Sequence, residues 1–390
     1  MTIGIDKIGF ATGRYRLDME NLAQSRGVDA DKFSKGLLLD ALSITPITDD
    51  IVTLGASAAN SILTEDDKAM IDMIIVATES SIDQSKAAAV YIHKLLGIQP
   101  FARSLEFKEA CYSATAALNY AKLHVEKHKK AKVLVIASDI AKYGINTPGE
   151  PTQGSGSVAM LVSQNPRLLE IHDDNVAQTR DIMDFWRPNY STTPFVDGMY
   201  STKQYLDMLK TTWAEYQKRS GKTLADFSAF CFHLPFPKLA LKGLHKIMDK
   251  RLPDRKKETL KANFDASIIY SRQIGNIYTG SLFLGLLSLL ENSNSLQGGE
   301  QIALFSYGSG AVAEIFSATL VSDFKKQLQT NRKEQLNQRQ SISVADYEKL
   351  FFEEATLDAF GNANFANYAT NDFYLSAIKE HQRIYEAKHG

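Results

Sequence analysis

The sequence is poor in cysteine and has no long hydrophobic run. Its 390 residues include only 2 cysteines, Cys111 and Cys231, which form no CxxC pair. Such a low count suits a reducing compartment without a disulfide framework, so each is treated as a free thiol. The longest apolar stretch, at 281–290, is too short to cross a bilayer, and the first residues lack the pattern of a secretion signal. We therefore expect a cytoplasmic protein without membrane association.

An excess of charge of one sign is also lacking. The chain carries 44 basic and 45 acidic side chains, a formal net charge of -1, so it has no global field that would hold nucleic acid. The spacings HExxH, paired CxxC, the EF-hand loop, GxGxxG and GxxxxGK[ST] are missing as well. We expect neither a metal ion nor a cofactor. With 44% hydrophobic residues, the chain can bury one large core or two fused ones.

Apolar, β-branched runs alternate with longer helical patterns along the chain. This alternation is typical of parallel strands joined by crossover helices, and it predicts an α/β fold. We expect strands at 2–12, 70–80, 102–108, 131–139, 156–164, 167–173, 227–234, 301–308 and 310–320, and helices at 17–24, 49–64, 84–96, 111–128, 203–219, 237–250 and 279–291.

An internal repeat relates the two halves of the chain. The segment GSGSVAMLV at 154–162 resembles GSGAVAEIF at 308–316, an offset of 154 residues (308 minus 154). Glu79 and His233, each at the end of an expected strand, differ by the same 154 residues (233 minus 79). The repeat predicts two fused α/β halves.

We place the halves at residues 1–165 and 166–390. Four polar residues hold corresponding places, two at strand ends and two at helix starts: Glu79, His233, Cys111 and Asn276. Because ligands in α/β folds gather at the C-terminal ends of strands, we expect these four to converge.

Two segments fall outside the repeat. Residues 175–205 mix aromatic, turn and charged residues over a length that suggests a lid or a binding insert. Residues 323–355 are charged and helix-prone, which favours a solvated helix with a connecting loop over a partner-binding tail.

Cys111 is the first candidate nucleophile. It precedes a helical run that begins with small residues, and a helix N-terminus lowers the pKa of a thiol and binds negative charge. The alternative is an inert buried cysteine, which is the commoner state of free cysteines. Cys231 is the rival nucleophile, but Phe230 and Phe232 flank it in an apolar strand, which favours core packing.

Other candidates lie near the same element ends. Glu79 becomes a general base if it faces the shared site, or an ordinary surface acid if it faces solvent. His233 is either a satisfied structural group or a partner of the thiol. Asn276 is as consistent with a helix cap as with a substrate ligand. Lys238 and Lys242 share one helix face, which is either solvated or able to hold a phosphate-bearing substrate.

Several motifs, in this order, resemble those of the bacterial 3-hydroxy-3-methylglutaryl-CoA synthase family in the thiolase superfamily. They are ATES around Glu79, EACYSATAAL around Cys111, FCFHLPFPK around His233, GNIYTGSL around Asn276 and SYGSG at 306–310. The resemblance spans essentially the whole chain. It implies a thiolase-like fold, in which two pseudo-repeated halves form a five-layered αβαβα core, and a homodimer.

The resemblance also implies an acyltransferase of the mevalonate pathway that makes 3-hydroxy-3-methylglutaryl-CoA from acetyl-CoA, acetoacetyl-CoA and water. Cys111 would carry the acetyl group, Glu79 would remove a methyl proton, and His233 would position and polarise the second substrate. Backbone N–H groups at Cys111 and at the Ser309 turn are candidate oxyanion donors. The resemblance further implies substrate contacts at Asp29, Ala30, Thr152, Ser201, Lys238, Lys242, Asn276 and Ser309.

Two other functions are consistent with parts of this pattern. An initiating 3-ketoacyl carrier-protein synthase would use a Cys, His and Asn set, but decarboxylative condensation needs no carboxylate base such as Glu79. A non-catalytic thiolase-like scaffold would keep the fold without forming an acyl-enzyme. A papain-like hydrolase fits poorly because of the α/β repeat.

Overall fold

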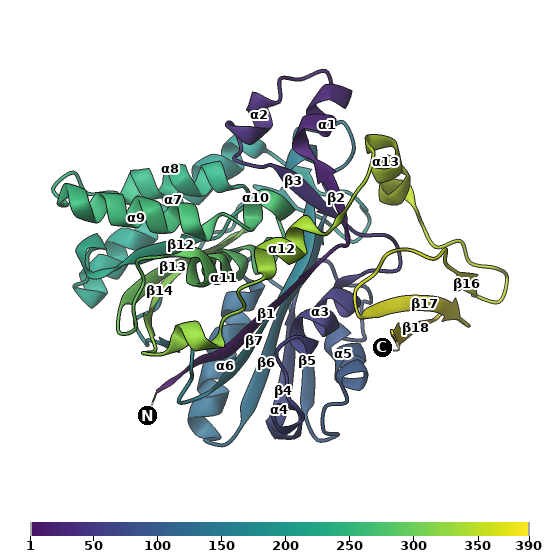
Figure 1. Ribbon diagram of the computed structural model, residues 1–390, viewed down its shortest axis with the longest axis horizontal. Coiled ribbons are helices and arrows are strands. Elements are labelled where there is room, and N and C mark those ends of the chain that lie inside the picture. Colours follow the sequence, from purple (N-terminus) through teal and green to yellow (C-terminus); the bar gives the residue numbers. More distant parts are fainter. Residues whose placement is uncertain (1, 389–390) are drawn as a thin grey trace.

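A computed structural model describes residues 2–388, and its centre is a large mixed sheet (Figure 1). The N-terminal half supplies five neighbouring strands. Counted from β1 outward, the first two pairs of neighbours are antiparallel and the next two pairs are parallel. In spatial order these strands are β1 (Ile3–Thr12), β7 (Gly154–Gln164), β6 (Lys132–Ala141), β4 (Ile71–Ala77) and β5 (Arg103–Phe107). β5 is one of the two edge strands of the sheet, and β12 of the C-terminal half is the other.

The C-terminal half repeats this pairing pattern. Its strands follow the order β8 (Leu169–Ile171), β14 (Val312–Leu320), β13 (Gln301–Gly308) and β12 (Ala229–Phe232), with β9 (Val176–Thr179) also paired to β14. The β8–β14 and β14–β13 pairs are antiparallel and the β13–β12 pair is parallel, the same sequence of pairings as in the N-terminal half. β1 pairs with β8, so one hydrogen-bonded sheet runs through both halves. The repeat seen in the sequence is therefore present in the fold, while the predicted boundary at 165/166 stays a prediction.

Helices form three layers around the two parts of the sheet. The central layer contains α6 (Ser113–Lys127) and α11 (Ser281–Asn292), which share one hydrophobic core. α3 (Ile51–Asn60) and α5 (Ala88–Leu96) cover the outer face of the N-terminal strands. α7 (Gly198–Ser220) and α8 (Pro237–Ile247) cover the outer face of the C-terminal strands, and α9 (Asp254–Ser267) packs against β12 and α11. The order is helix, sheet, helix, sheet, helix.

The strands alternate between two buried faces. On β4, Met73, Ile75 and Ala77 face the central core, whereas Ile74 and Val76 face the outer core. This period of two follows from the pleat of a strand, and burial on both faces explains why the strand reads as a continuous apolar run. A side chain two residues beyond Ala77 continues the central face, which directs Glu79 toward the first turn of α6.

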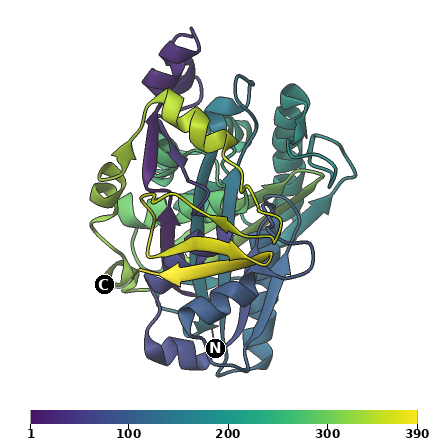
Figure 2. The same cartoon turned by 90° about the vertical axis from the view of Figure 1, so that its right-hand side faces the viewer.

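Smaller elements complete the chain. Near the N-terminus are β2 (Tyr15–Asp18), α1 (Met19–Ser25), α2 (Asp31–Ser34), β3 (Ala41–Ile44) and α4 (Glu65–Met70). In the second half, α10 (Ser271–Ile274) leads to the short helix η3 (Tyr278–Gly280), and 3-10 turns also occur at Glu150–Thr152, Leu224–Asp226 and Phe324–Gln327. The chain ends in β16 (Ala363–Asn364), β17 (Phe373–Lys379) and β18 (Gln382–Ala387), a small sheet that lies against α3 and α5 (Figure 2).

The expectation of a largely solvated, helical segment at 323–355 agrees with the structure, which also shows how the segment packs on the fold. This segment forms α12 (Arg332–Asn337), β15 (Gln340–Ser341) and α13 (Val344–Phe352), and β15 pairs with β2. Leu336 and Tyr347 are buried, and Arg332 forms a buried ion pair with Glu291 of α11. Arg332 and two apolar side chains thus anchor the segment to the fold, while most of its residues are exposed.

The insert at 175–205 is partly framework and partly a small hairpin, and its role as a lid or binding insert stays a prediction. Its first residues form β9, which belongs to the main sheet, and its last residues open α7. Between them β10 (Phe185–Trp186) and β11 (Phe195–Val196) form a small hairpin in which Trp186 stacks on Phe195. Among residues 2–388, no helix is long and apolar enough to cross a membrane.

Candidate functional site

The Cys111 thiol and the Glu79 carboxylate lie in direct contact. The Cys111 Sγ donates a hydrogen bond to Glu79 Oε1 at 3.0 Å. Glu79 follows the C-terminal end of β4, and Cys111 lies two residues before α6. Both residues keep some exposed surface, so the pair is reachable by a substrate. Two of the four residues that were expected to converge therefore form one unit.

The protein environment raises the pKa of both members of the pair. Burial is the main cause for Glu79, and the Asp139 carboxylate adds to it. Burial and then the Glu79 charge raise the pKa of the Cys111 thiol well above its usual range. The expected lowering by a helix N-terminus was wrong, because desolvation and the adjacent carboxylate outweigh a partial dipole charge. The resting thiol is protonated.

The turn that carries Cys111 is strained and tightly packed. Ala110 has a φ of 40°, a conformation rarely adopted by residues other than glycine, Asn and Asp. The Gly-Ser-Gly turn after β13 lies against this turn: a Cβ at Gly308 would come within 2.7 Å of Tyr112 N and 2.8 Å of Glu109 O. Only glycine fits there, which explains this part of the repeated motif.

Asp139, a residue that the sequence did not single out, organises the turn after β4. It is fully buried at the end of β6. Its Oδ1 accepts hydrogen bonds from the Glu79 and Ser80 backbone N–H groups at 2.9 and 3.0 Å and from the Thr78 hydroxyl at 2.8 Å. Its Oδ2 accepts from Thr279 N at 3.2 Å. The same carboxylate thus fixes the backbone of Glu79 and raises the pKa of its side chain.

His233 is buried directly after β12. It is 2% exposed, and its Nδ1 has no hydrogen-bond partner in the structure. Burial lowers the pKa of His233 to about 3, so the imidazole is neutral at physiological pH. The Tyr205 hydroxyl donates to the His233 carbonyl oxygen at 2.8 Å. Cys231, two residues earlier, is fully buried in the central core and burial raises its pKa to about 12, which confirms the expected core packing.

Asn276 acts as a structural link beside the pair. Its Oδ1 accepts from Tyr278 N at 2.9 Å and from the Ser281 hydroxyl at 2.8 Å, so it links η3 to the first residue of α11. Its Nδ2 donates to the Tyr143 hydroxyl at 2.9 Å. Asn276 thus has a local structural role, although it is not the N-cap residue of either helix. Thr152 lies next to it, since the Thr152 carbonyl oxygen accepts from Asn276 N at 3.1 Å.

A second carboxylate, Asp184, joins the insert to the turn after β13. It is fully buried and accepts from the Tyr307 hydroxyl at 2.8 Å, from Gly310 N at 2.9 Å and from the Ser201 hydroxyl at 3.1 Å. Ser201 is thereby placed at the first turn of α7, and Ser309 lies between two residues held by the same carboxylate. The sequence missed Asp184 because a lone Asp in an irregular insert carries no pattern.

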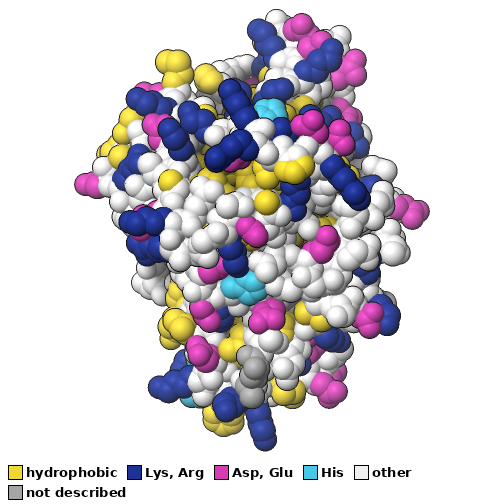
Figure 3. Space-filling view, turned by 90° about the vertical axis from the view of Figure 1, so that its left-hand side faces the viewer, with side chains coloured by type: hydrophobic (Ala, Val, Ile, Leu, Met, Phe, Trp, Pro, Cys, Tyr) yellow, Lys and Arg dark blue, Asp and Glu magenta, His cyan; other side chains and the backbone are white. Residues whose placement is uncertain are grey.

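The remaining predicted contacts lie on neighbouring surface elements. Asp29 and Ala30 precede α2, and the exposed Asp29 accepts a hydrogen bond from Asp31 N at 2.9 Å. Lys238 N donates to Leu37 O at 3.1 Å, which brings the start of α8 against this segment. Lys242 is exposed one turn further on. Figure 3 shows Lys and Arg side chains gathered on the upper part of the molecular face where α7, α8 and α9 lie.

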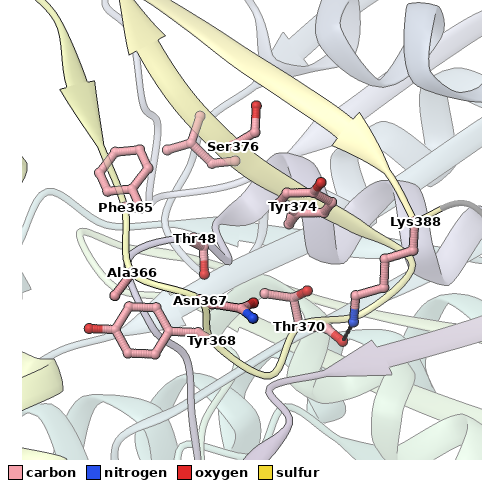
Figure 4. A pocket seen from close by; sticks show the side chains of 10 residues that line it. Thr48, Phe365, Ala366, Asn367, Tyr368, Thr370, Tyr374, Ser376 and Lys388 are labelled. Carbon is pink, nitrogen blue, oxygen red and sulfur yellow. Dashed lines mark hydrogen bonds between the residues drawn. The ribbon is translucent and has the colours of Figure 1, made fainter.

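Of two surface cavities, one borders this arrangement and the other lies away from it. One of about 690 Å³ is lined by Glu79, by the loop up to Ala87 and by Arg187 of the insert. Arg187 also donates to the Glu79 carbonyl oxygen at 2.5 Å. The other, of about 360 Å³, lies between the C-terminal sheet and the loop of Thr48, and none of the predicted site residues lines it (Figure 4). The chemistry therefore centres on the Glu79 end of β4.

Comparison with known proteins agrees with this geometry. The family model for the N-terminal part of hydroxymethylglutaryl-coenzyme A synthase matches residues 2–166, and the model for its C-terminal part matches residues 175–251 and 244–388. The chain belongs to the hydroxymethylglutaryl-CoA synthase family. It is 53% identical to the hydroxymethylglutaryl-CoA synthase of Enterococcus faecalis over 92% of this chain and 93% of that protein.

Solved structures extend the comparison. A hydroxymethylglutaryl-CoA synthase crystallised with CoA matches with a TM-score of 0.99 and 71% identity, covering 100% of both chains. A relative in complex with 3-hydroxy-3-methylglutaryl coenzyme A matches with a TM-score of 0.89 and 31% identity, covering 100% of this chain and 99% of the other. The fold is thus that of the thiolase-like condensing enzymes, and the chain is an acyl-transferring enzyme of this family.

Proposed function

We propose that Cys111, Glu79 and His233 carry out the condensation of acetyl-CoA with acetoacetyl-CoA and water to 3-hydroxy-3-methylglutaryl-CoA and CoA. The observation that supports these roles is the hydrogen bond from the Cys111 thiol to the Glu79 carboxylate. It joins the nucleophile needed for an acyl-enzyme to the base needed for carbon-carbon bond formation.

Acetylation comes first. Cys111 Sγ attacks the acetyl-CoA carbonyl carbon, and its proton passes to Glu79 and then to the departing CoA sulfur. Because the two exchanging thiols are chemically similar, this step needs little help from a base. It leaves an acetyl thioester on Cys111 and an ionised Glu79, which is the state required for the next step.

Condensation uses the same carboxylate. Glu79 removes a proton from the acetyl methyl group, and the resulting carbon bonds to the ketone carbon of acetoacetyl-CoA. The new alkoxide takes the proton back from Glu79. An acetyl methyl group is a weak acid, so the raised pKa of the carboxylate makes it a stronger base for this transfer. Water then cleaves the thioester, which releases the product and returns the proton to the Cys111 sulfur.

His233 acts as a neutral hydrogen-bond donor to the second substrate. Its buried imidazole does not take up a proton near neutral pH, so it polarises the ketone without changing charge. We assign stabilisation of the developing oxyanion to backbone N–H groups at Cys111 and Ser309. Gly310 N is already held by Asp184, so it is not one of these donors.

The remaining properties follow as further proposals. The surface residues Asp29, Ala30, Lys238 and Lys242, of which Asp29 and Lys242 are exposed and the other two half-buried, line the entrance for the CoA part of the substrate. Thr152, Ser201, Asn276 and Ser309 contact the acyl part or hold its neighbours. The reaction needs neither a metal ion nor a cofactor, because nucleophile, base and donor are protein groups. We place the enzyme in the cytoplasm and in the mevalonate pathway.

A homodimer is supported by a free edge of the sheet. β5 is one of the edge strands, and exposed apolar side chains lie beside it, among them Phe101 at 90% exposure and Leu123 of α6. An unpaired edge with apolar neighbours is a ready surface for a second copy of the chain. A mass near twice 43.3 kDa in light scattering would agree with the dimer, and a monomer at micromolar concentration would exclude it.

The decisive experiment is intact-protein mass spectrometry with peptide mapping after brief exposure to acetyl-CoA alone. We expect one acetyl group on the peptide that holds Cys111 and none in Cys111→Ala. Adding acetoacetyl-CoA should discharge it and form the six-carbon product. Acetyl on Cys231, or no acetyl at all, would refute the nucleophile assignment and favour a non-catalytic scaffold. Discharge by a malonyl thioester alone would favour an initiating 3-ketoacyl synthase.

A further inference from the structure

A buried ion pair joins two segments that border the proposed substrate path. Arg26 is the C-cap of α1 and lies shortly before Asp29, and Glu150 begins the 3-10 turn Glu150–Thr152. The Arg26 guanidinium donates to both carboxylate oxygens of Glu150, through Nε at 2.9 Å and through Nη2 at 2.7 Å. Only 13% of the Arg26 side chain and 3% of the Glu150 side chain are exposed. The two residues are 124 positions apart in the chain, so the pair is a tertiary link.

The pair is rigid because of its geometry and its burial. A planar guanidinium that donates twice to one carboxylate fixes orientation as well as distance. The hydrogen bond to Glu150 is the main cause that raises the pKa of Arg26 above its usual range. Arg26 Nη2 also lies 2.7 Å from Glu348 Oε1 of α13, so the guanidinium is held from two sides. A buried carboxylate left without its cation would be strongly unfavourable, which keeps the pair together.

The Glu150 carboxylate also organises the loop at 143–153. Its Oε2 accepts from Asn146 N at 3.0 Å, and its Oε1 accepts from the Tyr347 hydroxyl at 3.3 Å. Asn146 has a φ of 58°, a left-handed conformation that is uncommon outside glycine and is stabilised here by this contact. Glu150 therefore determines the path of the loop, and Arg26 determines the place of Glu150.

This loop borders the acyl end of the site. The Gln153 side chain accepts from Tyr143 N at 2.7 Å, and Asn276 Nδ2 donates to the Tyr143 hydroxyl at 2.9 Å. Thr152 O accepts from Asn276 N at 3.1 Å. Burial and then the charges of the catalytic pair raise the pKa of Tyr143, so its ring lies near that pair. A displacement of Glu150 would therefore reach the residues beside the reacting groups.

We propose that Arg26 and Glu150 are positioning residues, which couple binding of the CoA part of a substrate to placement of its acyl part. This inference rests on the proposed contacts of Asp29 and Ala30 with CoA. Remote binding energy can position a reacting group when the two sites are firmly joined. CoA would hold the segment after α1, and the ion pair would transmit that position to the loop at 143–153.

The preference for CoA over a truncated thioester measures this coupling. We would follow acetylation of Cys111 by acetyl-CoA and by S-acetyl-N-acetylcysteamine, which lacks the nucleotide and its phosphates. In Glu150→Gln the maximal acetylation rate with acetyl-CoA should fall by about 10- to 100-fold, the scale expected for displaced reacting groups. The rate with the truncated thioester should fall much less, because that substrate makes no use of the link. Partial unfolding alone would lower both rates equally.

Variants of both partners identify the pair as the cause. Arg26→Gln should have the same effect as Glu150→Gln, and the double variant should be no worse, since either change breaks the link. Arg26→Lys keeps the charge and should preserve folding, but one ammonium cannot hold the carboxylate in the same way, so a several-fold loss should remain. Asp6→Asn is the control, because it breaks a similar pair near the start of β1, where Arg167 donates to Asp6 at 2.7 and 2.6 Å. It should lower the Tm and leave the preference unchanged.

The outcomes separate this inference from the proposed function. An unchanged preference in both Arg26→Gln and Glu150→Gln would overturn the inference alone, and if those two variants do not fold, Arg26→Lys decides the matter. A rise in KM for acetyl-CoA at an unchanged maximal rate would also overturn it, because the pair would then only shape the CoA entrance. If wild type reacted equally well with both thioesters, or formed no acetyl-enzyme, the proposed function would fail and this inference with it.

Discussion

At the residue scale, the active site depends on one shared proton between a thiol and a carboxylate. Burial and the mutual proximity of Cys111, Glu79 and Asp139 make two negative charges unfavourable, so the resting pair holds a proton. In the proposed mechanism, acetylation removes the thiol from this competition and leaves Glu79 free to act on the acetyl group. The proposed order of the chemical steps therefore agrees with the electrostatics of the pair.

Replacing the base should separate the two steps. In Glu79→Gln the amide oxygen still accepts the thiol hydrogen, and thiol exchange needs little base, so acetylation of Cys111 should persist. Carbon-carbon bond formation should fall by about 100- to 10,000-fold, because no group removes the methyl proton. Quenched-flow mass spectrometry of each step measures both. Equal loss of both steps would contradict the assignment of Glu79.

The pH dependence should reflect the raised pKa of Glu79. Condensation requires the carboxylate, so its single-turnover rate should fall as the pH drops through that pKa, which lies above the usual carboxyl value of about 4.3. His233, with a pKa of about 3, should add no step between pH 5 and pH 8. A profile that is flat down to pH 5 would show that Glu79 is not perturbed as the structure indicates.

The sequence predicted the residues of this pair but not their electrostatics. Cys111 and Glu79 lie at element ends, and the topology of an α/β repeat brings such ends together. The prediction that the pKa of the Cys111 thiol is lowered was wrong. That pKa depends on burial and on a carboxylate 32 positions away in the chain. Asp139 and Asp184 were missed because each is a single polar residue with partners that are distant in sequence.

At the element scale, the turn after β13 and the turn before α6 support each other. Gly308→Ala would place a Cβ against Tyr112 N and Glu109 O and push the Cys111 turn away. We expect acetylation to slow by about 10- to 100-fold, since small displacements of reacting groups are costly. Gly198→Ala, where a Cβ meets nothing within 4 Å, is the control and should retain the wild-type rate. Equal rates in the two variants would contradict the packing argument.

The strands and main helices were predictable, but the peripheral elements were predictable only in part. β4, β6, β7, β13 and β14 are apolar on both faces, which gives a strong local signal. The helical character of residues 323–355 was predicted, but the buried ion pair that joins Arg332 to Glu291 was not, because no local pattern reveals a partner so distant in the chain. The C-terminal sheet was not expected either, because apolar and polar residues do not alternate clearly in the sequences of its two longer strands, FYLSAIK and QRIYEA.

At the scale of the whole molecule, the two halves form one cooperative structure. β1 and β8 pair across the junction, α6 and α11 share the central core, and the Arg272 guanidinium donates twice to Asp40 of the other half, at 2.7 and 2.9 Å. The active site lies between these halves, with Cys111 from one and the turn around Gly308 from the other. Neither half could hold the site alone.

Thermal unfolding should therefore occur in a single transition. Circular dichroism and the loss of acetylation activity, measured as probes of unfolding, should give the same midpoint temperature. Gly4→Ala tests the junction, because its Cβ would come within 2.0 Å of Leu169 O, where β1 meets β8. We expect a loss of about 1–3 kcal/mol in the free energy of unfolding, typical of overpacking, still in one transition. Gly198→Ala should change the Tm little. Two separate transitions in Gly4→Ala would mean that the halves fold independently and that the junction only holds them together.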